Sequence, residues 1–161
     1  MEKDEILAKF LKLDDTSEII PERDNIYGNK DSLFSYGTED YAVLTDDEAD
    51  KAFYDLETEL FDEMNFDAFN ESWLKDSVSI YIDNDELRQA TDGEYDDVTL
   101  FLNNYGYEEL YNLIKDDEKL FDKDDFFEDV KISDGRGILA TYDGQENEIT
   151  VDGETYYIYN I

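Results

Sequence analysis

Carboxylates are the only abundant side chains in this sequence that support site chemistry. The chain has 46 Asp and Glu residues against 13 Lys and Arg, and it contains neither histidine nor cysteine. Triads and the commonest general base are therefore excluded. A carboxylate pair can serve a glycosidase, but among 46 acids any spacing arises by chance. We expect a non-enzymatic protein, with a small-molecule or metal-dependent enzyme as an alternative.

Metal binding is the second chemistry that carboxylates support. The segment IDNDELRQATDGEYDD, residues 82–97, superficially resembles a calcium loop. Counted from Asp83, the fifth position is Leu87 and the sixth is Arg88, where an EF-hand needs a ligand and a glycine. The acids at 92–97 and 122–125 would hold hard cations only loosely. We expect no cofactor, no specific metal and a solvated charged face.

The densest acidic run, residues 45–64, has the pattern of one helix. TDDEADKAFYDLETELFDEM holds nine acids and a single base, Lys51. Like charges three or four residues apart destabilise a helix by roughly 0.2–0.5 kcal/mol per pair. Thr45 and Glu48 form a capping box. A buried stripe is predicted at helical spacing, made of Ala49, Ala52, Phe53, Leu56, Leu60 and Met64. A helix that keeps so many mutually repelling acids at a cost in helix stability suggests a functional surface.

The acids of this helix form two predicted rows. At 100° per residue one row contains Glu48, Asp55, Glu59 and Asp62, and the other contains Asp46, Asp50 and Glu57. Tyr54 and Phe61 are expected between the rows, away from the buried stripe. Spacings of four and seven residues separate carboxylates by about 6 and 10 Å. These distances are comparable with phosphate separations along a nucleic-acid strand, so the surface would suit a groove built for DNA or RNA.

The net charge of −33 restricts the partners. DNA, RNA and anionic membranes would be repelled, whereas a basic protein would be attracted. A net charge of about 2–8 suffices for the solubility of a small domain. Adaptation to high salt is the alternative explanation. No segment approaches the roughly 20 apolar residues of a membrane span, and the N-terminus lacks the apolar run of a signal peptide. We expect a cytoplasmic protein.

Element patterns predict a single acidic α+β domain over residues 1–161. Residues 1–39 would be an extension, with a helix at 3–13 (Ile6, Leu7, Phe10 and Leu13 inward) and a loop at 14–39. A strand follows at 40–44, and helices are expected at 95–104, 107–115 and 117–130, with Gly106 as a break. Residues 68–82 are ambiguous between helix and strand.

The C-terminus, 130–161, is predicted to be a three-stranded antiparallel β-meander packed with several amphipathic acidic helices. Asp143-Gly144 and Asp152-Gly153 would be its turns. Gly135-Arg136-Gly137 is expected to be a tight turn between helix and sheet, with Arg136 pairing neighbouring acids. The aromatic residues are interpreted as core, namely Phe101, Tyr142, Tyr156, Tyr157 and Tyr159.

Three segments resemble a family of small, acidic, mostly uncharacterised proteins encoded by bacteriophages and mobile elements. They are DYAVLTDDEADKA (40–52), NFDAFNESWLK (65–75) and DGRGILATYDGQENEITVDGETYYIY (134–159). The family often has an EYLVLTDEEAD-like helix start and a DGRGHxLxxYDGxExE…YYIY ending. Ile138 stands where the family usually has a His, so any role of that His is absent here. The resemblance implies a phage origin but transfers no general function.

A small acidic phage protein resembles, by charge and context, the DNA-mimicking anti-CRISPR and anti-restriction inhibitors of host defence. We therefore expect an inhibitor acting in the infected bacterial cytoplasm, with a CRISPR effector nuclease as the first candidate target. It would occupy the basic channel that reads the short duplex motif (PAM) beside the target. The alternatives are an anti-restriction protein and an immunity or antitoxin protein that neutralises a basic toxin.

The expected contact residues fall into three groups. The first is the acids of the helix, Asp46, Asp50, Asp55, Glu57, Glu59 and Asp62. The second is a separate acidic face of Asp92, Glu94, Asp96 and Asp97. The third is a pair of aromatic anchors, Tyr54 and Phe61.

Overall fold

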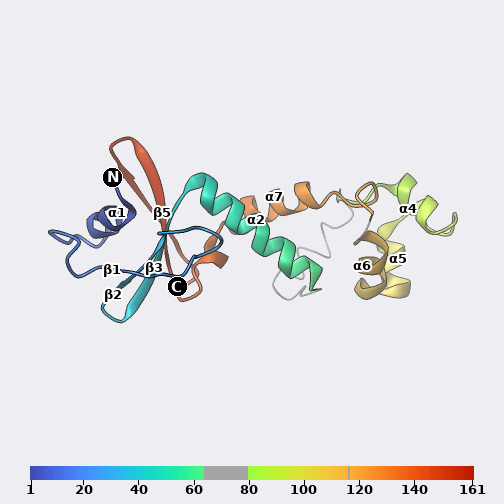
Figure 1. Ribbon diagram of the computed structural model, residues 1–161. Coiled ribbons are helices and arrows are strands. Elements are labelled where there is room, and N and C mark those ends of the chain that lie inside the picture. Colours follow the sequence, from blue (N-terminus) through green and yellow to red (C-terminus); the bar gives the residue numbers. More distant parts are fainter. Residues whose placement is uncertain (64–79, 116) are drawn as a thin grey trace. The chain divides into compact units, whose positions relative to one another are not determined.

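The computed structural model describes residues 1–63, 80–115 and 117–161 (Figure 1). Contacts divide the chain into two compact units. Unit 1 comprises Met1–Asp55 and Asp134–Ile161, and unit 2 comprises Leu56–Ser133. The prediction of a single domain over 1–161 does not anticipate this division, which falls inside helix α2 (Asp46–Asp62).

Unit 1 is built on a five-stranded antiparallel sheet. Its strands have the spatial order β1-β2-β3-β5-β4, and they are β1 (Ile20–Pro21), β2 (Leu33–Tyr36), β3 (Glu39–Thr45), β4 (Glu146–Val151) and β5 (Glu154–Asn160). Figure 1 shows β3, from the first third of the chain, beside β5 from the C-terminal end; Val43 is paired with Ile158. The α+β class is confirmed.

The predicted three-stranded C-terminal meander is corrected by this sheet. Only its last two strands form, joined at Asp152 and Gly153, which both have positive φ (53° and 83°). This is the conformation that a two-residue type I′ hairpin requires. Residues 137–144 instead fold back on themselves, because the N–H of Gly144 donates to the carbonyl of Ala140 (2.8 Å). The strand that pairs with the other edge of β5, in place of a third C-terminal strand, is β3.

The predicted loop at 14–39 is wrong in part, because it contains β1 and β2. These short strands pair with each other, and β2 pairs with β3. Pro21 has no N–H to donate and lies in the outermost strand, where that loss costs least. Strands of two and four residues are too short to show a clear alternation in the sequence.

Helix α1 (Lys3–Phe10) covers one face of the sheet. It ends three residues earlier than predicted. Ile6 and Leu7 are buried in the core with Val43 and Ile158, and Phe10 packs at the edge of this cluster. Alternation along a strand sends neighbouring residues to opposite faces, so Tyr157 and Tyr159 of β5 lie on the other face, where the Gly-Arg-Gly turn is found.

Unit 2 is helical in its described part. After the C-terminal half of α2 come α4 (Asn84–Ala90), α5 (Val98–Tyr105), α6 (Tyr107–Ile114) and α7 (Lys123–Asp134), the last of which ends at the boundary. Helices α5, α6 and α7 confirm three predicted helices with shifted bounds. The break at Gly106 is confirmed, since its φ of +83° ends α5 and begins α6. Helix α4 was not predicted.

An aromatic cluster forms the core of unit 2. The Phe61 ring stacks on Phe121 with centroids 5.7 Å apart and meets Phe126 and Phe127 edge-on. Tyr81 packs edge-on against Phe126 (5.3 Å). Burial of large aromatic rings is a major source of stability in a small unit. Most of the ambiguous segment 68–82 and the resemblance segment 65–75 lie outside the described residues.

Candidate partner-binding site

The Gly-Arg-Gly turn holds a buried cation in unit 1. It follows α7 and leads into a short 3-10 helix, Gly137–Leu139, instead of directly into a strand. A Cβ at position 137 would lie 2.2 Å from the carbonyl oxygen of Gly144, so only glycine lets these two loops approach so closely. The approach fixes the loop that carries Arg136, whose side chain is only 7% exposed.

Three carboxylates surround the Arg136 guanidinium. Its Nη1 donates to Asp46 (3.0 Å) and Asp50 (2.9 Å), and its Nε donates to Glu146 (2.8 Å). The guanidinium also lies 4.4 Å from the centre of the Tyr157 ring, within range of a cation–π interaction. The pairing of Arg136 with nearby acids is confirmed through Glu146, and α2 supplies two more acids from about 90 positions away.

Burial and hydrogen bonding together shift the pKa values of two members of this cluster, Arg136 and Tyr159. Burial opposes the charged form of Arg136, but hydrogen bonds to Glu146 and Asp46 outweigh it and raise its pKa. Burial and the hydrogen bond to Glu146 (2.5 Å) raise the pKa of the Tyr159 phenol. Asp46 and Asp50 were predicted to face a partner, but both bind the buried Arg136, whose single positive charge offsets part of their negative charge. They join the start of α2 to the C-terminal segment.

The rest of α2 in unit 1 is also partly neutralised. Glu48 binds Lys3 (2.6 Å), and Asp55 binds Lys51 (2.7 Å). The Thr45 cap is confirmed, since its Oγ1 accepts from the N–H of Glu48 (3.3 Å). Of the predicted buried stripe, Ala49, Ala52 and Phe53 are buried. The Tyr54 side chain is 37% exposed.

In unit 2, the predicted orientation of α2 is wrong for two residues. Phe61 is 2% exposed and Glu57 is 3% exposed, so neither presents a surface to a partner. The Phe61 ring belongs to the aromatic cluster, and its burial displaces the stripe expected through Leu56 and Leu60, which are only half-buried. Met64 lies outside the described residues.

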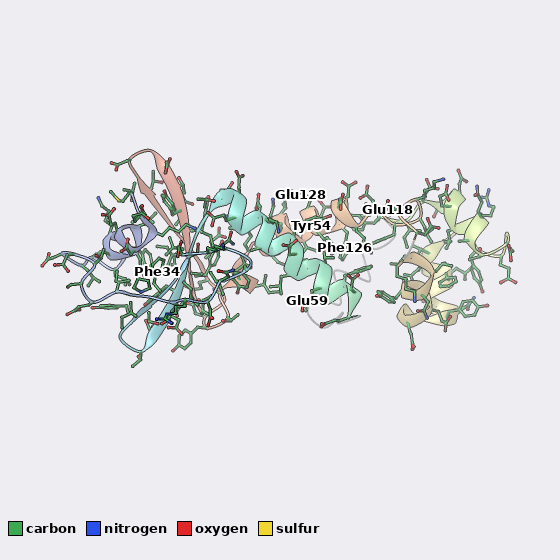
Figure 2. The ribbon with its side chains drawn as sticks, viewed as in Figure 1. Phe34, Tyr54, Glu59, Glu118, Phe126 and Glu128 are labelled. Carbon is green, nitrogen blue, oxygen red and sulfur yellow. The ribbon has the colours of Figure 1, made fainter. Side chains whose placement is uncertain are left out.

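The two remaining acids of the α2 prediction stay at the surface of unit 2. Glu59 is exposed (Figure 2), and no base in the described part of the chain forms an ion pair with it. Asp62 is 4.0 Å from Lys123 Nζ, a weak pairing at an exposed position.

The second predicted face, at 92–97, is divided by local roles. Asp97 caps α5 by accepting from the N–H of Thr99 (2.8 Å), and Asp96 binds Arg88 (3.3 Å). Asp92 and Glu94 are exposed. They belong to the lining of a pocket of about 310 Å³.

A more crowded acidic surface, whose residues were not among the predicted contact residues, lies along α7. We call it the acidic groove: about 580 Å³, with a floor at Tyr81 and Ile82. Its remaining lining consists of six carboxylates and one base, Asp83, Glu118, Asp122, Asp125, Glu128 and Asp129 with Lys119, together with Ile80. The spacing of Asp125, Glu128 and Asp129 on one helical face was the signal available in the sequence.

Crowding of like charges defines the electrostatics of this groove. The nearby charge of Asp122 raises the pKa of Asp125, as expected when neighbouring carboxylates resist a second ionisation. Burial and a hydrogen bond to Asp129 (2.5 Å) raise the pKa of the Tyr81 phenol. Glu118 and Glu128, labelled in Figure 2, are exposed, and Glu128 is 3.2 Å from Lys131.

The groove therefore attracts cations, but its geometry is not that of a metal centre. Within residues 1–63, 80–115 and 117–161, no group of three or more potential ligand side chains could hold a metal ion. A cationic side chain, which needs no fixed coordination shell, is the group that such a surface suits.

None of the described helices is long and apolar enough to cross a membrane.

The fold and this surface define an acidic α+β protein with an anionic groove. No protein-family model, curated protein or solved structure matches the chain.

Proposed function

We propose that this protein is a non-enzymatic inhibitor of a host defence nuclease and that it acts as a DNA mimic. The proposed target is the basic nucleic-acid channel of an RNA-guided CRISPR effector, where arginines read the short duplex motif beside the target. The observation that carries the proposal is the acidic groove, in which six carboxylates are opposed by one lysine.

Carboxylate spacing on α7 supports the comparison with nucleic acid. Asp122, directly before α7, and Asp125 and Asp129 within it are separated by three and four residues, or about 4.5 and 6 Å along a helix axis. One strand of DNA carries one phosphate per roughly 3.4 Å of axis. Lysine and arginine side chains that track a phosphate strand can therefore reach successive carboxylates here.

The charge of unit 2 supports a basic partner. Residues 56–133 contain 24 acids and six bases, so their field repels nucleic acid and steers a cationic surface toward the protein. Asp46, Asp50, Glu57 and Phe61 leave the proposed contact set because they are engaged internally or buried. The revised set lies in unit 2 and comprises Glu59, Glu118, Asp125 and Glu128, which are all exposed. Tyr54, a residue of unit 1, stays a separate prediction of an aromatic anchor.

The decisive experiment neutralises groove acids that do not support the fold. The double variant Glu118→Gln/Asp125→Asn removes two charges and spares Asp83 and Asp122, which accept from backbone N–H groups at helix starts. The matched control, Glu18→Gln/Asp24→Asn, removes two exposed acids of unit 1. DNA cleavage by purified CRISPR effectors and restriction enzymes is measured against inhibitor concentration at two salt concentrations.

The groove variant is expected to weaken inhibition about tenfold, a loss of about 1.4 kcal/mol, with the larger loss at low salt. The control is expected to change inhibition less than twofold. Equal losses in both variants would reduce the proposal to an effect of bulk charge.

Order of addition tests whether the channel is the target. An effector that is loaded with its DNA before the protein is added should resist inhibition, because the DNA then fills the channel. An effector that is exposed to the protein first should be inhibited. Equal inhibition in either order would exclude competition for that channel.

A further inference from the structure

A second pocket, on a different part of unit 2, combines aromatic rings with carboxylates. It has a volume of about 310 Å³ and lies where the end of α4, the following turn, α5 and α6 meet. Its aromatic lining is Tyr95, Phe101 and Tyr105, and its acids are Asp92, Glu94 and Glu109. The pocket has no residue in common with the acidic groove.

The three rings form one connected surface. Tyr95 meets Phe101 and Tyr105 edge-on, with centroids 5.4 and 5.7 Å apart, and Phe101 is 5.1 Å from Tyr105. Phe101 is buried, whereas the Tyr105 side chain is 51% exposed. Because Tyr105 is half-exposed and lines the pocket, its aromatic ring is accessible to a ligand.

The turn that carries Asp92 and Glu94 is fixed in place. Its backbone passes through positive φ at Asp92 and Gly93. The N–H of Gly93 donates to the carbonyl of Arg88 (2.7 Å), and the N–H of Tyr95 donates to Thr91 Oγ1 (3.0 Å). Asn104 donates to the Tyr95 hydroxyl (3.0 Å). A pocket held in this way loses little conformational entropy when it binds a ligand.

We propose that this pocket binds a cationic side chain, and specifically an arginine guanidinium, by cation–π contact with its rings and ion pairing with its acids. An aromatic face attracts a cation within about 6 Å of its centre, and the acids repel a phosphate or carboxylate. Arginine is favoured over lysine because the planar, weakly hydrated guanidinium stacks on rings. That this arginine belongs to the nuclease rests on the function proposed above.

A small-molecule probe separates the pocket from the partner. N-acetyl-arginine amide is titrated into the full chain and followed by NMR, with N-acetyl-citrulline amide as the probe of nearly the same shape without the charge. The arginine probe is expected to shift resonances of Tyr95, Tyr105 and Glu94. The citrulline probe is expected to bind at least fivefold more weakly.

Two substitutions at one exposed ring test the cation–π contribution. Tyr105→Leu removes the π face and is expected to weaken binding of the arginine probe at least fivefold. Tyr105→Phe keeps the ring and is expected to stay within twofold. Glu94→Gln, at an exposed acid, is an independent variant that keeps the test decisive if Tyr105→Leu misfolds. It is expected to weaken binding of the arginine probe about threefold.

The outcomes are distinguishable. No shifts at the pocket, equal binding of arginine and citrulline, or unchanged affinity in both Tyr105→Leu and Glu94→Gln would overturn this inference. Arginine binding at the pocket in a protein that inhibits no nuclease would support the pocket and reject the proposed function. Nuclease inhibition that is insensitive to Tyr105→Leu, together with no probe binding, would reject the pocket alone.

Discussion

Units 1 and 2 have nearly the same excess of acid but arrange it differently. Unit 1 has 22 acids and seven bases, and unit 2 has 24 acids and six bases. In unit 1 a buried arginine binds three carboxylates, and lysines bind Glu48 and Asp55. In unit 2 six acids line one groove beside a single lysine. Composition alone therefore does not identify a functional anionic surface.

The distinction is between acids that stabilise the fold and acids that the fold tolerates. A carboxylate that receives hydrogen bonds from a buried guanidinium contributes to stability, and losing the guanidinium leaves it without its partner. A carboxylate that raises the pKa of its neighbour destabilises the unit at neutral pH. Acids of the second kind, retained at a local cost, are the better functional candidates.

The largest expected effect is the loss of the guanidinium of unit 1. Arg136→Met should lower the free energy of unfolding by about 3 kcal/mol, the lower end of the range for breaking a buried ion pair, because its acids are partly exposed. Lys51→Met breaks one exposed pair and should cost about 0.5 kcal/mol. Urea denaturation measures both. Similar losses would show that the arginine cluster is no more structural than a surface pair.

A smaller loss is expected from the turn that positions this arginine. Gly137→Ala places a Cβ 2.2 Å from the Gly144 carbonyl oxygen, and separating the two loops should cost about 2 kcal/mol. The cost should shrink in the Arg136→Met background, because the displaced loop then has no ion cluster to lose. A double-mutant cycle measured by urea denaturation gives this coupling. If the losses in unfolding free energy of the two single variants add strictly, the turn and the ion cluster stabilise the protein independently.

The smallest effect concerns pH and Asp125 of unit 2. Its raised pKa means that, above the ordinary value of 3.8, the folded state binds the proton more readily than the unfolded state. Stability should therefore rise as pH falls from 7 toward that value. Asp125→Asn should be more stable than the original chain at pH 7, and the difference should narrow on acidification. The urea midpoints of both proteins between pH 7 and 4 test this expectation. If the difference in stability between Asp125→Asn and the original chain stays constant over this range, crowding of carboxylates is not the cause of that difference.

Features governed by neighbours in the chain are predicted well from the sequence. The Thr45 cap, the break at Gly106 and the turn at Asp152 and Gly153 are confirmed because each depends on a few consecutive residues. The α+β class follows from the same local periodicities. The C-terminal meander was wrong because the pairing of β3 with β5 joins residues more than 100 positions apart.

The candidate site depends on such distant contacts even more. An acidic row on a helix wheel does not reveal that Arg136 binds Asp46 and Asp50, nor that Phe61 turns inward to meet Phe121. The acidic groove brings residues 80–83 together with α7. Helical spacing could have identified the α7 face alone, but not the tyrosine and isoleucine floor beneath it.

The margins of the sheet carry a consequence of their own. At one margin, β1 is two residues long and contains Pro21; at the other, β4 places Glu146 and Glu148 along its length. A short strand without one amide hydrogen, and a strand bearing repeated charge, are poor templates for an incoming strand. Pairing of this sheet, edge to edge, with the sheet of a second copy is therefore disfavoured at both margins.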